Sequence, residues 1–147
     1  MYTSKDAQKL FMKRNELIAD LNICEALCQE NSDSHEPELA ELMRTLRYRI
    51  SIIDSLFNLV SYTELFVIQS RLIHGMNWSQ VAVIYNQTWG KENELSIRTL
   101  QLRLKSGIAK ATNAMNQRPK VPWSEILDAP SCWSSADPCQ FRPLGLD

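Results

Sequence analysis

The chain has 147 residues, of which 44% are apolar and 22% charged, a composition that excludes a disordered or low-complexity protein. This length can bury a core without disulfide staples. The net charge of −1 hides an uneven distribution. Residues 1–60 contain seven Lys or Arg and ten Asp or Glu. Residues 61–120 contain eight basic and three acidic residues, and residues 121–147 contain one basic and four acidic residues. A basic middle block between acidic flanks indicates a local surface for an anionic partner.

The first half of the chain predicts two long helices. Five of the six prolines lie at or after Pro119, so helix breakers are rare before it. Apolar periodicity predicts a helix from Ser4 to Glu30, a polar turn over 31–36, and a second helix from Pro37 to about residue 60. The second helix carries apolar residues at three-four spacing: Leu39, Leu42, Leu46, Ile50, Ile53, Phe57 and Val60.

Two amphipathic helices joined by a short loop predict an antiparallel hairpin over residues 1–60. The stripe on the second helix has two interpretations, which its spacing alone does not separate. It forms either an internal seam against the first helix or a homodimer seam between subunits. The hairpin would then serve oligomerisation or the binding of a partner protein.

The basic middle block, 61–117, predicts a helix-turn-helix domain. Its expected helices cover residues 63–74, 78–85 and 96–115. Thr63 and Ser96 are the expected N-caps of the first and last of these helices. Gly75 supplies the tight turn after the first, and 86–95 is expected to be a polar loop or a frayed extension of the second helix.

The helix over 96–115 is the expected DNA-reading element. At about 100° per residue, one narrow apolar face forms. This face contains Ile97, Leu100, Leu104, Ile108, Ala111 and Met115. The remaining surface presents Arg98, Thr99, Gln101, Leu102, Arg103, Lys105, Ser106 and Lys110. From Ser96 to Lys120 there are six Lys or Arg and no Asp or Glu, which suits a phosphate-lined major groove.

These polar-face residues divide into two expected roles. Residues near the N-terminus of a recognition helix usually reach base edges, which assigns base reading to the first four. Among them, Leu102 could contact a thymine methyl group. The later four, from Arg103 to Lys110, are expected to position the phosphate backbone. The alternative interpretation is an ordinary solvated basic face of a helical bundle.

The order of these elements resembles a known family. Its marks are Thr63-Glu64 at a helix start, Arg71 with Gly75 at its close, the aromatic-to-Ala pattern of 78–82, and the cap and opening of 96–104. Together they resemble the promoter-reading C-terminal region of sigma-70 family factors. They also resemble phage late-gene regulators of the RinA and ArpU kind. The resemblance covers about residues 62–115, although the last two helices are farther apart here than in sigma-type modules.

The resemblance implies an all-helical, sequence-specific DNA-binding transcriptional regulator whose partners are double-stranded DNA and RNA polymerase. Two alternatives remain open. One is a DNA-packaging protein of the small-terminase kind, which would form rings. The other is a polymerase-binding module that never touches DNA, for which weak, salt-insensitive DNA binding would be evidence.

Catalytic, metal and membrane functions have weak signals. The chain has two histidines, no nucleophile elbow and no phosphate-cradling glycine loop, so no enzyme activity or cofactor is expected. Cys24 and Cys28 have zinc-like spacing, but Cys132 and Cys139 do not supply a second close pair, so no metal is expected. Without a secretory pattern or a membrane-length apolar run, we expect a cytoplasmic protein with free thiols.

The segment 118–147 is an acidic, Pro-containing tail with apolar anchors. A short helix is expected over 121–129. We expect the tail to pack back on the helices and to offset part of the basic surface through its Asp and Glu residues. The expected anchors are Trp123, Ile126, Trp133 and Phe141. The alternative is a tail that orders only on a partner.

Overall fold

The computed structural model describes residues 1–30, 37–90 and 93–130, and all regular structure in these residues is helical. This confirms the all-helical class for the described part of the chain. The elements are α1 (Ser4–Glu30), α2 (Pro37–Phe57), α3 (Tyr62–Ile68), the π-helical turn η1 (Gln69–Ile73), α4 (Trp78–Trp89), α5 (Ile97–Gln117) and α6 (Trp123–Asp128). Across the same residues, no helix has both the length and the apolar character that crossing a bilayer requires.

The helix boundaries follow the sequence expectations, with one correction at the cap of α3. Ser61, not Thr63, is the N-cap of α3, because its hydroxyl accepts the Glu64 backbone N–H. For residues 86–95 a loop or a frayed helical extension was expected, and the structure shows the extension over four residues, with α4 ending at Trp89. The Asn86 side chain explains this, because its amide donates to the Leu95 carbonyl (3.1 Å) and accepts the Leu95 N–H (3.0 Å). Leu95 is thereby held against the last turn of α4.

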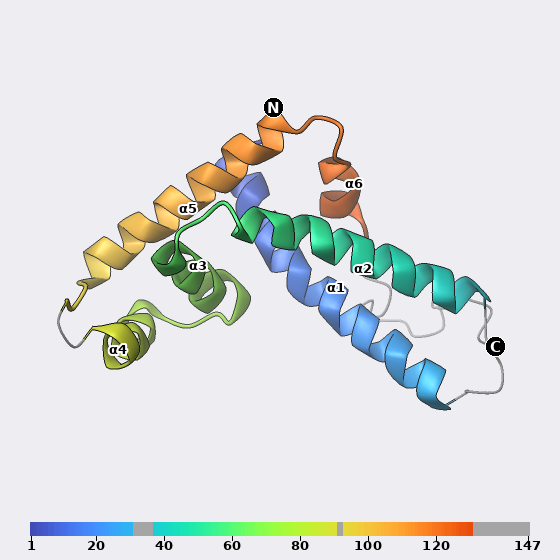
Figure 1. Cartoon of the computed structure of the whole chain (residues 1–147), viewed down its shortest axis with the longest axis horizontal. Coiled ribbons are helices and arrows are strands. Elements are labelled where there is room, and N and C mark those ends of the chain that lie inside the picture. The colour runs from blue at the N-terminus through green and yellow to red at the C-terminus, as the bar shows by residue number, and fades with distance from the viewer. Residues whose placement is uncertain (31–36, 91–92, 131–147) are drawn as a thin grey trace.

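Helices α1 and α2 lie side by side and run in opposite directions (Figure 1). The rings of Phe11 and Phe57 stack with centroids 5.3 Å apart. Arg14 Nε donates to the Asp54 carboxylate at 2.6 Å, which adds an ion pair between the helices. The pair is therefore joined by both apolar and charged contacts along its length.

The apolar stripe of α2 is an internal seam. Leu39, Leu46 and Ile53 are buried within the single chain. Partly buried Leu42, Ile50 and Phe57 pack against the same core. Because the fold already covers this stripe, the homodimer interpretation of these residues has no support in the structure.

One core joins the first two helices to the rest of the described chain. It combines residues from both sides of position 60, such as Leu10, Ile53, Ile108 and Met115. Helix α6 closes one side of this core with Trp123, Ile126 and Leu127. The first part of the expected tail is thus packed on the body, while Trp133 and Phe141 lie outside the described residues.

A smaller core fixes α3, α4 and α5 to one another. Val67, Val81, Tyr85 and Leu100 are buried together there. Trp89 adds edge-to-face contact with Phe66, with ring centroids 5.0 Å apart. This smaller core carries the N-terminal half of α5, and Figure 1 shows that end of the helix beside α4.

Candidate nucleic-acid interface

Helix α5 begins at a well-formed cap and buries one face. The Ser96 hydroxyl accepts the Thr99 N–H at 3.1 Å. The buried residues of α5 are Leu100, Gly107, Ile108, Ala111, Ala114 and Met115. Ile97 was expected on this face, but its side chain is 39% exposed. As the first residue of the helix, it lies at the edge of the smaller core instead of within it.

Five of the eight predicted DNA-binding residues form an open surface on the first half of α5. They are Arg98, Gln101, Leu102, Arg103 and Lys105, and all five are exposed. Leu102 is 55% exposed, so its side chain is free to contact a partner. Within the described residues, none of the three cations of this open surface forms an ion pair.

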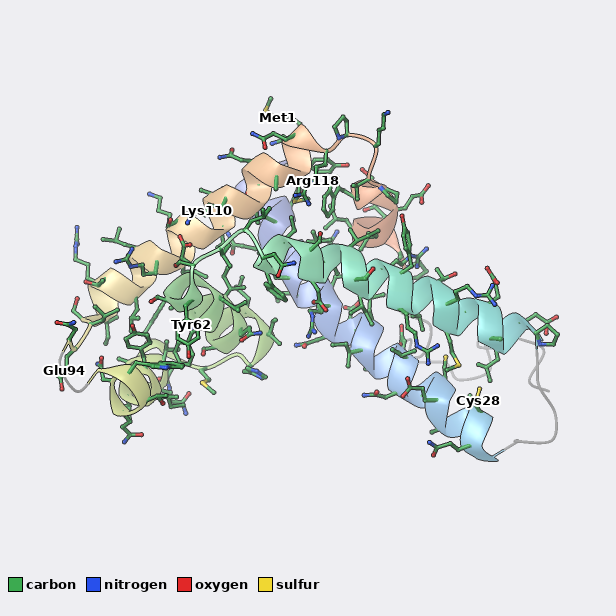
Figure 2. All side chains as sticks on the ribbon, viewed as in Figure 1. Met1, Cys28, Tyr62, Glu94, Lys110 and Arg118 are labelled. Carbon is green, nitrogen blue, oxygen red and sulfur yellow. The ribbon has the colours of Figure 1, made fainter. Side chains whose placement is uncertain are left out.

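The other three predicted residues are occupied by contacts within the chain. The Thr99 hydroxyl lies 3.0 Å from the Ser96 hydroxyl, inside the cap. Ser106 donates its hydroxyl proton to the Glu64 carboxylate, and Lys110 Nζ donates to the same carboxylate at 2.7 Å. Figure 2 shows Lys110 on the side of α5 that faces α3. These three side chains therefore position α5 in the structure.

Glu64 is a buried carboxylate that connects the start of α3 to the middle of α5. Its side chain is 2% exposed. It also completes a capping box, because Ser61 N–H donates to its Oε1 at 2.7 Å. Helix α3 packs closely on α5 at Gly107, where an added Cβ would lie 3.2 Å from the Glu64 Cβ.

The sequence places Glu64 at a helix start but does not indicate that it links α3 to α5. The Ser61-x-x-Glu64 spacing is a capping-box pattern, so this part of the role was open to sequence reasoning. The pairing with Ser106 and Lys110 was not, because those residues are 42 and 46 positions away. Only the tertiary fold brings them together.

The contacts of Glu64 determine its acidity. Burial alone would raise the pKa of this carboxyl group. Hydrogen bonds from Lys110, Ser106 and Ser61 outweigh burial and lower the pKa from 4.5 to about 2. Each of these donors stabilises the charged form, so the folded protein holds Glu64 ionised.

We expect this group to make stability depend on pH. The folded pKa lies below the unfolded value, so the stabilisation is present above pH 4.5 and is lost as the pH falls towards 2. Between pH 7 and pH 3 the loss from Glu64 should be about 2 kcal/mol. Urea unfolding at both pH values measures it. In Glu64→Gln this part of the pH dependence should vanish, whereas Glu125→Gln, at an exposed site, should keep it.

Equal pH dependence in the parent and in Glu64→Gln would contradict this assignment.

The turn between α3 and α4 is also held by specific contacts. Gly75 has φ +66°, which confirms the glycine turn. Arg71 donates to the Met76 carbonyl at 2.6 Å, and its guanidinium lies 4.8 Å from the centre of the Trp78 ring. Asn77 caps α4 in a capping box with Gln80. These contacts fix the direction in which α4 leaves the turn.

Comparison with protein-family models, with curated proteins and with solved structures finds no match. The resemblance to sigma-type modules therefore stays a prediction. Among residues 1–30, 37–90 and 93–130, no group of three or more His, Cys, Asp or Glu is placed to hold a metal ion. In the described part, the surface with the clearest chemistry is the open surface of α5.

Proposed function

We propose that the protein is a sequence-specific DNA-binding transcriptional regulator that reads the major groove with α5. The observation that supports this most is the open surface of α5, which holds three cations without carboxylate partners in the described residues and an exposed leucine. In this proposal Arg98, Gln101 and Leu102 contact bases, because they lie in the first turns of the helix. Arg103 and Lys105 contact phosphates.

The length of α5 and the contacts that hold it in place suit this role. A helix of 21 residues is about 30 Å long, and a major groove about 12 Å wide admits an α-helix. The Glu64 contacts, the smaller core and the main core hold α5, and they leave Arg98, Arg103 and Lys105 exposed on its first half. A reading helix needs this rigidity, because side chains must reach base edges in a fixed register.

Because Thr99, Ser106 and Lys110 make contacts within the chain, we expect the DNA-binding energy to come from the other residues of the α5 surface. We assign these residues to positioning α5. Their replacement would therefore disturb the fold as well as any binding. The phosphate-contacting role passes to Arg103 and Lys105, which are exposed and have no ion pair among the described residues.

The first experiment is a random-library DNA selection with the purified protein, followed by variants on the selected site. Arg98→Ala and Gln101→Ala should each weaken specific binding by about 1–3 kcal/mol and relax base preference. Arg103→Ala and Lys105→Ala should weaken binding to all sequences alike and reduce the salt slope by about one each. Arg44→Ala, which removes a cation from the exposed part of α2, is the control.

The proposal fails if all four α5 variants bind like the parent. A ring-forming mass in solution, together with DNA binding, would favour the packaging alternative. Weak DNA binding that does not respond to salt would favour a module that binds only RNA polymerase.

A further inference from the structure

Two exposed lysines at the start of α1 have no ion-pair partner among the described residues, as is the case for the cations of the open surface of α5. In the first two helices Lys13, Arg14, Arg44 and Arg47 each have a carboxylate partner. Within the described residues, no carboxylate lies within ion-pair distance of the other two lysines of α1, Lys5 and Lys9.

The nearest acidic side chains in sequence are already occupied. The Asp6 carboxylate accepts the Thr3 N–H at 2.8 Å, and the Glu16 carboxylate pairs with Lys13 at 2.8 Å. Lys5 and Lys9 line one shallow surface depression of α1, so their charges lie next to each other.

Direct hydrogen bonds fasten this end of α1 to the C-terminal end of α5. Tyr2 N–H donates to the Asn116 side chain at 2.8 Å, and the Asn116 amide donates to the Tyr2 carbonyl at 3.1 Å. The Tyr2 hydroxyl lies 2.9 Å from the Ser124 hydroxyl, which adds α6 to the junction. Figure 2 shows Met1 beside this end of α5, close to Arg118.

Asn116 lies on the same side of α5 as part of its open surface. Arg98, Lys105 and Asn116 are separated by seven and eleven residues, and both spacings return to within about 20° on an α-helix. The start of α1 is therefore hydrogen-bonded to the same side of α5 on which Arg98 and Lys105 lie.

We propose that Lys5 and Lys9 form a second anchor for the phosphate backbone of the DNA that α5 reads. This rests on the proposed function and extends its contact surface from α5 to α1. A straight helix leaves the curved groove after a few turns, and the C-terminal part of a recognition helix commonly meets the backbone. Lysines suit this contact because each is a mobile point charge that needs no fixed base geometry.

The test compares two double variants that remove the same charge. Lys5→Gln with Lys9→Gln removes the proposed anchor, and Arg44→Gln with Arg47→Gln removes two cations from α2. Glutamine keeps the helix propensity, and circular dichroism checks the fold of both. Binding to a fluorescent random-sequence duplex and to the selected site is measured across a range of salt concentrations.

The α1 variant should lose about two units of salt slope and about tenfold or more in affinity near 0.1 M salt, with base preference unchanged. The α2 variant should bind like the parent. Equal salt slopes for the two double variants would overturn the second anchor while leaving the reading role of α5 intact. If the parent binds no duplex at all, the proposed function fails first and the anchor fails with it.

Discussion

Ile53→Glu should lower the free energy of unfolding by at least about 4 kcal/mol, which is a large part of the stability of a typical domain. Ile53 is fully buried in the seam between α1 and α2. A carboxylate there would lose its water without gaining a partner. Tyr48→Glu is the matched control, because it adds the same charge to the same helix at a side chain that is 58% exposed.

Urea unfolding followed by circular dichroism measures both variants, and light scattering measures the mass of the parent. We expect Ile53→Glu to lose its helical signal at low urea and Tyr48→Glu to unfold like the parent. A parent dimer that Ile53→Glu converts into a folded, helical monomer would contradict the internal seam. That result would restore the intersubunit interpretation of the α2 stripe.

Trp123→Ala should cost about 3–5 kcal/mol of stability, because it leaves a large cavity in the main core. Trp123 is 1% exposed, and its indole N–H donates to the Arg118 carbonyl at 3.0 Å. The neighbouring α6 residues Ile126 and Leu127 are buried in the same core. The segment after α5 is thus expected to be part of the folded body and not an appendage.

The control for this prediction is Glu125→Ala, at an exposed position of the same short helix. It should unfold within about 0.5 kcal/mol of the parent, as surface substitutions usually do. Thermal or urea unfolding compares the two variants. A Trp123→Ala protein as stable as the parent would show that α6 contributes little to the core in solution.

Local patterns were enough to predict the helices of this protein. The three-four spacing on α2, the glycine at position 75 and the Ser96 cap each depend on residues within one or two turns of the chain. Such short-range signals fix helix positions because they depend on backbone hydrogen bonds and on one buried face. The error at Thr63 arose because the neighbouring Ser61 forms a capping box with Glu64 and takes the N-cap position.

The sequence by itself therefore determined the helical class, the approximate helix boundaries and the basic surface of α5. Only the tertiary structure decided which basic residues remain open. The sequence places Lys110 on the polar surface of the helix together with Lys105, but in the fold Lys110 and Ser106 both donate to the Glu64 carboxylate of α3. The same holds for the α2 stripe, whose partner is α1. The reason is physical: a periodic pattern shows that a face must be covered or paired, while the identity of its partner depends on contacts between residues far apart in the chain.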